Sequence, residues 1–130
     1  MKKTILSLLS LLLTITATAR DVRNFDDNWL FTLGDAAAMA QPDYDDSGWR
    51  RLNVPHDWAI EGDFYASNPS GASGGALPGG IGWYRKHFQL EPNDNHSKYY
   101  IAFDGVYMNS TVYVNGHEVG TRPYGYSSFE

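Results

Sequence analysis

The sequence predicts an all-β domain, an antiparallel β-sandwich or jelly roll, on three observations. Short runs with alternating apolar residues recur along the chain, and clusters of Pro, Asp, Asn, Ser and Gly separate them. Asn115-Gly116 lies between two apolar runs, which is a strong hairpin signal because both turn positions need a positive φ. Only residues 35–40, DAAAMA, could begin a helix, and their pattern does not favour one. Many short strands with polar turns are typical of sandwiches and jelly rolls.

The predicted strands follow these alternating runs. They cover residues 28–34, 83–90, 99–106 and 110–120. In the first run, alternation puts Trp29, Phe31 and Leu33 on one face. In the second, Trp83 and Tyr84 begin a strand that we expect to pack the sandwich, and Phe88 is expected to be buried on the same face as Tyr84.

Residues 1–19 have the three parts of a secretory signal. Lys2 and Lys3 form a basic start, an apolar run covers residues 5–15, and Ala17 and Ala19 stand at the −3 and −1 positions of a cleavage site. The apolar run is too short to span a bilayer comfortably. We therefore expect a signal peptide, no membrane span, and an exported domain over residues 20–130 in the periplasm or at the cell surface.

Composition excludes some classes of partner. The formal net charge of the 130 residues is −5, and loss of Lys2 and Lys3 would make the chain more acidic. Nucleic acid is not expected as a partner, because phosphates select basic surfaces. There is no cysteine, so a fold in an oxidising compartment would depend on its hydrophobic core, to which 15% aromatic residues can contribute.

The densest group of chemically active side chains lies at His56, Asp57 and Trp58, followed by Glu61 and Asp63. A His beside an Asp suggests catalysis, but the chain has no Gly-x-Ser-x-Gly nucleophile motif, and its histidines lack zinc-ligand spacing. The structural alternative is a turn stiffened by proline, with the Trp packed and the Asp bonded to backbone amides.

Asp43, Asp45 and Asp46 form an acidic cluster with two interpretations. A polar turn, in which the carboxylates accept from backbone N–H groups, is favoured. A calcium site is the alternative, because Ca²⁺ takes oxygen ligands.

Aromatic residues and one long loop suggest a carbohydrate ligand. Sugar C–H faces stack on aromatic rings, and clefts lined by aromatic and small polar groups suit such ligands. The aromatic residues near predicted loops are Trp58, Tyr65, Trp83, Tyr107, Tyr124 and Tyr126. Packing alone is the alternative explanation. Residues 67–82 are rich in Gly, Ser and Pro, and we interpret them as a functional loop within one domain rather than a linker.

Five motifs together resemble the N-terminal sugar-binding domain of family 2 glycoside hydrolases, most closely the exported β-galactosidases of Bacteroidetes. The motifs are FDDNWLF, DDSGWRRLNVPHDW, GALPGGIGWYRKHF, IAFDGVYMNSTVYVNGHEVG and YGYSSFE. The resemblance covers residues 25–130. It implies a jelly-roll-like, galactose-binding-domain-like sandwich that precedes an immunoglobulin-like domain and a catalytic (β/α)₈ barrel. Because a sandwich usually has about seven or eight strands, we expect this domain to be incomplete at its C-terminus.

The resemblance also implies a division of labour. The family is retaining and uses two glutamates in the barrel, so no catalytic residue is expected in this segment. Nor is a metal or cofactor expected here, although the full enzyme could hold a divalent or monovalent cation. This domain would supply a loop at the rim of the carbohydrate site, and Asn68 falls in the region of that loop where some β-galactosidases have a sugar-contacting Asn. The alternative is that Asn68 is a turn residue ahead of Pro69. Asn68, His56, Asp57 and Trp58 are the candidate substrate-binding residues.

Two other functions remain open on the sequence. The chain could be a non-catalytic carbohydrate-binding module, or an adhesion or scaffold sandwich. A barrel with paired glutamates encoded downstream would favour the glycosidase, and glycan binding by the isolated chain would favour the module.

Overall fold

The computed structural model describes residues 21–90 and 98–130, and every structural statement below concerns these residues. The predicted signal segment, residues 1–19, lies outside them.

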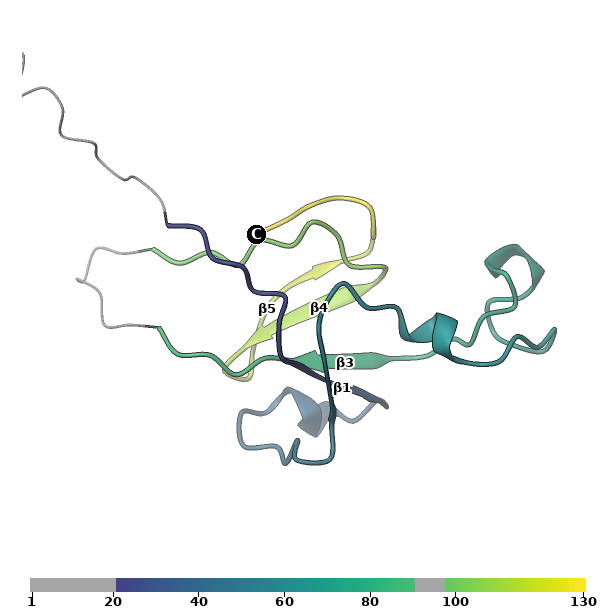
Figure 1. The fold of residues 1–130 in the computed structure, drawn as a ribbon, viewed down its shortest axis with the longest axis horizontal. Helices are drawn as coiled ribbons and strands as arrows, with labels where there is room; N and C mark the ends of the chain where they lie inside the picture. The colour runs from purple at the N-terminus through teal and green to yellow at the C-terminus, as the bar shows by residue number, and fades with distance from the viewer. Residues whose placement is uncertain (1–20, 91–97) are drawn as a thin grey trace, which may run out of the picture.

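Within the described residues the regular structure consists of short antiparallel strands and three 3₁₀ turns, which confirms the all-β class (Figure 1). The strands are β1 (Trp29–Leu33), β2 (Arg50–Leu52), β3 (Gly82–Arg85), β4 (Ser110–Val114) and β5 (His117–Arg122). The 3₁₀ turns are η1 (Ala37–Ala40), η2 (Trp58–Glu61) and η3 (Ala72–Gly74). None of the helical segments in these ranges is long and apolar enough to cross a membrane.

The first sheet has the order β2-β1-β3, so β1 is its central strand. Phe31 lies in the middle of β1, pairs with Arg50 on one side and Tyr84 on the other, and is only 6% exposed. Its ring lies 4.9 Å from that of Tyr84. Phe31 is therefore the centre of the small core, as its alternation predicted.

Leu33 departs from that prediction, because it is 54% exposed. It is the last residue of β1 and pairs with Gly82, which offers no side chain to cover it. Alternation assigned the correct face, but burial depends on a neighbour that the glycine does not provide.

The strand predicted over residues 83–90 is wrong beyond Arg85, where β3 ends. The last pair of the ladder joins Arg85 to Leu30, and the chain before β1 turns at Asn28, which has a φ of 59°. By this register only Trp29 of β1 remains opposite the residues after Arg85, so no β1 backbone lies opposite the residues beyond Lys86. Phe88, predicted to be buried in this strand, is 44% exposed and meets the ring of Phe25 edge to face at 5.0 Å.

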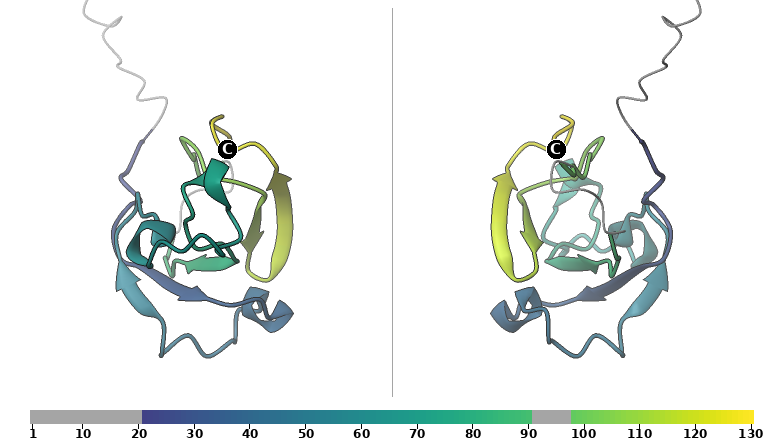
Figure 2. Two further views of the ribbon diagram at one scale, coloured as in Figure 1. Left: turned by 90° about the vertical axis from the view of Figure 1, so that its right-hand side faces the viewer. Right: turned by 90° about the vertical axis from the view of Figure 1, so that its left-hand side faces the viewer.

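Strands β4 and β5 form the predicted hairpin, which flanks the first sheet in both views of Figure 2. Asn115 and Gly116 have φ values of 50° and 82°, so the expected turn is confirmed. The ring of Tyr113 in β4 stacks on that of Trp83 in β3, with centroids 5.7 Å apart. This aromatic contact links the hairpin to the first sheet.

Two further expectations were wrong. Residues 99–106 form no strand; they contain one isolated bridge, in which Phe103 pairs with Phe129. Residues 37–40, within the segment where no helix was favoured, form η1, and its closing bond runs from Gln41 N–H to Ala38 O at 3.0 Å.

Candidate functional site

The predicted group around His56 lies in a turn that leads out of β2. The Val54–Pro55 peptide bond is cis, and Val54 N–H donates to Asp26 O at 2.9 Å. Asp57 is the N-cap of η2, where its Oδ1 accepts from Ala59 N–H at 3.0 Å. Asp57 therefore has the structural role that the sequence offered as the alternative to catalysis.

His56 lies at the centre of a polar cluster with Arg50, Glu61 and Tyr84. Its Nδ1 is 2.7 Å from Tyr84 Oη, and its Nε2 is 2.9 Å from Arg50 Nη2 and 3.1 Å from Glu61 Oε1. Arg50 Nη2 also donates to Glu61 Oε2 at 2.7 Å. Because a guanidinium can only donate and an ionised carboxylate can only accept, Nε2 accepts from Arg50 when it is unprotonated and donates to Glu61 when it carries a proton.

The hydrogen bonds in this cluster favour the ionised form of Glu61, which does not suit an acid catalyst. The Arg50 hydrogen bond, followed by that from His56, lowers the pKa of Glu61 below its usual value. A general acid needs a raised pKa, so Glu61 is unsuited to that role. Burial, followed by the negative charges of Asp57 and Glu61, raises the pKa of Tyr84 to about 12. The cluster ties β2, η2 and β3 together.

Trp58, the first residue of η2, packs against the point where the long loop re-enters the sheet. A Cβ on Gly82 would lie 2.9 Å from Trp58 Nε1 and 3.1 Å from Phe31 Cε2. Only glycine permits this approach, so the indole is a packing group at the edge of the core.

Residues 62–81 form a long loop that projects from the sheet, at the right of Figure 1. Asn68 Nδ2 donates to Asp63 O at 2.9 Å and to Ala76 O at 2.7 Å. Ser70 Oγ donates to Leu77 O at 2.7 Å. Both amide hydrogens of Asn68 are thus used inside the loop, and a ligand would meet its Oδ1.

Two aromatic side chains on this loop face solvent. Phe64 is 66% exposed and Tyr65 is 58% exposed, and Tyr65 Oη donates to Asp63 Oδ2 at 3.2 Å. An exposed ring beside a carboxylate can stack on a sugar and accept from its hydroxyls. The structure does not bring this group together with His56, whose polar atoms bond within the sheet and η2.

The acidic cluster takes part in turn and ion-pair contacts. Asp45 Oδ1 accepts from Ser47 N–H at 3.0 Å, and Asp46 Oδ2 lies 2.6 Å from His87 Nε2 and 3.3 Å from Arg85 Nη1. The hydrogen bond from His87 is the main cause that lowers the pKa of Asp46. Nowhere in residues 21–90 and 98–130 do three or more His, Asp or Glu side chains gather as a metal site would require.

Arg85 makes contacts that the sequence did not predict. Its guanidinium donates to Met39 O, to Gln41 O at 3.0 Å and to Tyr44 O at 3.3 Å, and lies 5.1 Å from the ring of Trp49. It therefore holds residues 39–49 against β3. Alternation placed Arg85 opposite the apolar face, but the loop that it holds comes from a distant part of the chain.

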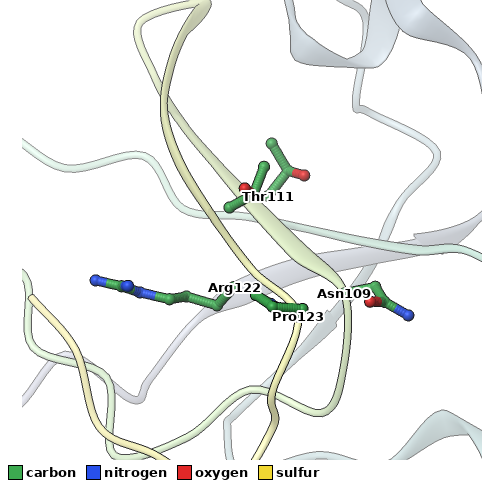
Figure 3. A pocket seen from close by; sticks show the side chains of 5 residues that line it. Asn109, Thr111, Arg122 and Pro123 are labelled. Carbon is green, nitrogen blue, oxygen red and sulfur yellow. The ribbon is translucent and has the colours of Figure 1, made fainter.

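A small pocket of about 290 Å³ lies on the β4–β5 hairpin (Figure 3). Its lining residues are Asn109, Thr111, Thr121, Arg122 and Pro123. None of the predicted site residues lines it. Its polar groups were not recognisable from the sequence, because the pairing of Thr111 with Thr121 creates one wall.

The fold and its register define an antiparallel β domain of the sandwich class. Over 110 residues the chain is 56% identical to the β-galactosidase BoGH2A of Bacteroides ovatus, matching 85% of this chain and 13% of that protein. It is 47% identical over 114 residues to a putative β-glucuronidase of Formosa agariphila, matching 88% of this chain and 11% of the relative. No family model matches the chain.

The similar solved structures are also glycosidases. A β-glycosidase from Bacteroides vulgatus superposes with a TM-score of 0.79 at 47% identity, covering 85% of this chain and 14% of that one. A glycosyl hydrolase family 2 member from Bacteroides cellulosilyticus gives a TM-score of 0.73 at 39% identity, covering 82% of this chain and 15% of that one. The chain is homologous to a domain of the family 2 glycoside hydrolases, as its motifs predicted, and it spans only 11–15% of the length of these four proteins.

Proposed function

We propose that this chain is the N-terminal part of a retaining glycoside hydrolase of the β-galactosidase type, which hydrolyses terminal O-glycosidic bonds in carbohydrates. The observation that carries the proposal is the 56% identity to a β-galactosidase over 110 residues. A second relative named as a β-galactosidase, from Thermoanaerobacter pseudethanolicus, is 33% identical over 111 residues.

Catalysis is assigned to residues outside this chain. A retaining mechanism needs two carboxyl groups about 5–5.5 Å apart, one protonated and one ionised. Glu61 pairs with Arg50 and has a lowered pKa, so it stays ionised at neutral pH. We place the two catalytic glutamates in a downstream (β/α)₈ barrel that follows an immunoglobulin-like domain. The greater length of the relatives supports this arrangement.

In this arrangement, residues 62–81 form part of the rim of the substrate site. Hydrogen bonds within the loop hold its shape, because the side chains of Asn68 and Ser70 donate to loop carbonyls. A preorganised loop can meet a sugar without first being ordered. Of the four candidate contacts we retain Asn68, through Oδ1, since the polar atoms of His56 and Asp57 are engaged in internal bonds.

The remaining expectations complete the proposal. Residues 1–19 act as a signal peptide, the protein is exported to the periplasm or cell surface, and the sandwich has jelly-roll connections. The lysines, apolar run and small residues of the N-terminal sequence support export. Any divalent or monovalent cation belongs to the rest of the enzyme.

The test uses the purified product of the whole gene with aryl β-D-galactoside, β-D-glucuronide and β-D-mannoside. We expect the galactoside to have the highest kcat/KM and ¹H NMR to show the β-anomer as the first product. Hydrolysis with inversion, or a preference for another glycoside, would contradict the proposal. Asn68→Ala loses Oδ1 and both amide bonds, and Ser70→Ala, which loses one internal bond of the same loop, is the control. If Oδ1 contacts the sugar, kcat/KM falls further for Asn68→Ala than for Ser70→Ala.

A non-catalytic carbohydrate-binding module is the second candidate. The observation that favours it is the number of tyrosines that face solvent, including Tyr107, Tyr124 and Tyr126. It predicts glycan binding without turnover by the whole gene product.

A further inference from the structure

The two ends of the projecting loop, residues 62–81, are packed together at its base. Trp58 begins η2, which leads directly into the loop, and its indole lies against the residue where the loop returns to β3. A Cβ on Gly82 would lie 2.9 Å from Trp58 Nε1, and a Cβ on Gly62 would lie 2.5 Å from Pro78 Cγ. The loop therefore leaves and re-enters the sheet through one closed base.

Beyond this base the loop packs against itself. A Cβ on Gly79 would lie 3.1 Å from Pro69 Cβ, so the two limbs of the loop touch there. Ala76 N–H donates to Gly71 O at 2.8 Å, and Gly71 N–H donates to Asn68 O at 3.0 Å. All of these contacts join the loop to itself and none of them reaches the sheet. The loop therefore holds its own shape, and its direction depends on its base.

Glu61 connects that base to the sheet. It is the last residue of η2, which lies between the sheet and the projecting loop in Figure 1. Its Oε2 accepts from Arg50 Nη2 at 2.7 Å, and its Oε1 lies 3.1 Å from His56 Nε2. Arg50 is the first residue of β2, and its guanidinium lies 5.3 Å from the centre of the Phe31 ring in the core. In the part of the chain that the structure describes, Glu61 is the only η2 side chain that hydrogen-bonds to a strand.

We propose that Glu61 is a positioning residue, which holds the projecting loop in the direction that brings Asn68 Oδ1 to the sugar. The inference deepens the proposed function and rests on it, because that proposal places the loop at the rim of the substrate site. A loop that keeps its own shape carries a small rotation at its base to its tip. Misplacement of a substrate contact by about 1 Å can cost on the order of 100-fold in rate.

The test is a double-mutant cycle between Glu61→Ala and Asn68→Ala in the purified product of the whole gene, with an aryl β-D-galactoside as substrate. If Glu61 acts through the loop, its loss should lower kcat/KM on the order of tenfold when Asn68 is present and less than about twofold when Asn68 is absent. Glu61→Gln keeps a carbonyl oxygen for Arg50 and should recover part of the loss. The control is Glu118→Ala in β5, a strand outside these contacts, and it should leave kcat/KM unchanged in both backgrounds.

Two kinetic results would overturn the proposal. An unchanged kcat/KM in Glu61→Ala, or losses that add to those of Asn68→Ala, would show that Glu61 does not act through the loop. A fall in kcat/KM that matches a fall in the folded fraction, measured by circular dichroism at the assay temperature, would indicate a structural role alone and would also overturn it. Should Glu61→Ala not fold, Glu61→Gln takes its place in the cycle.

Hydrogen exchange of the whole gene product separates this inference from the proposed function. If the wild type hydrolyses no galactoside, the proposed function fails, and exchange still tests the role of Glu61. Glu61→Ala should speed amide exchange in residues 57–62 and leave residues 68–76 as protected as in the wild type, because the bonds of residues 68–76 lie inside the loop. Unchanged exchange in residues 57–62, or lost protection in residues 68–76, would contradict a loop that is held at its base by Glu61.

Discussion

Tyr84 Oη lies 2.7 Å from His56 Nδ1, and this contact joins strand β3 to the turn that follows β2. The two residues are 28 positions apart in sequence, and each also packs against the ring of Phe31, at 4.9 and 5.0 Å. The bond therefore closes a polar rim over the small core.

Removal of this hydroxyl should weaken the domain. Tyr84→Phe keeps the ring on Phe31 but leaves His56 Nδ1 without its partner. We expect the free energy of unfolding to fall by about 1–2 kcal/mol in urea denaturation. Tyr100→Phe, which changes an exposed ring, is the control and should have no effect. Equal stabilities of the two variants would show that the bond contributes nothing.

The same residue should give the domain an alkaline pH dependence. The pKa of Tyr84 rises from 10.0 to about 12 on folding, so the folded state holds the proton more tightly than the unfolded chain does. This contribution is complete below pH 10 and is lost as the pH rises from 10 toward 12. The difference in unfolding free energy between wild type and Tyr84→Phe should therefore shrink from pH 8 to pH 11. A constant difference would mean that Tyr84 titrates alike in both states.

Arg85 should not be replaceable by lysine. Its side chain is only 13% exposed, and its planar guanidinium reaches several carbonyls of residues 39–44 at once. An ammonium group cannot cover that set. We expect Arg85→Lys to lose about 2 kcal/mol of stability and to become sensitive to proteolysis within residues 37–49. Arg51→Lys, an exposed change in β2, should retain wild-type protection.

Glycine is required at the point where the long loop re-enters the sheet. Gly82→Ala would place a Cβ 2.9 Å from Trp58 and 3.1 Å from Phe31, and we expect a loss of about 1–3 kcal/mol. Gly120→Ala in β5 is the matched control, because no atom lies within 4 Å of its added Cβ. The melting temperature should fall for the first variant alone. Similar values for both would place Trp58 away from β3.

Local signals predicted part of this structure correctly. The turn at Asn115-Gly116 and the burial of Phe31 depend on nearby residues, and both are confirmed. The end of β3 at Arg85 could not be predicted, because it depends on the chain turning away at Asn28 in a distant segment.

The candidate functional site could also be predicted only where it depends on nearby residues. The role of Asp57 as a cap could be anticipated from its place before η2. The partners of His56 come from β2, η2 and β3, and only the sheet register brings Arg50 and Tyr84 to opposite sides of Phe31. Asn68 was chosen by position in a resemblance, which could not show that its amide hydrogens bond to loop carbonyls.

The central claim is that this chain is a non-catalytic part of a larger β-galactosidase-type enzyme. The most direct test measures hydrolysis of an aryl β-D-galactoside by the purified product of the whole gene, beside residues 20–130 alone. The account predicts turnover by the whole product and none by residues 20–130. Turnover by residues 20–130, or none by the whole product, would contradict it.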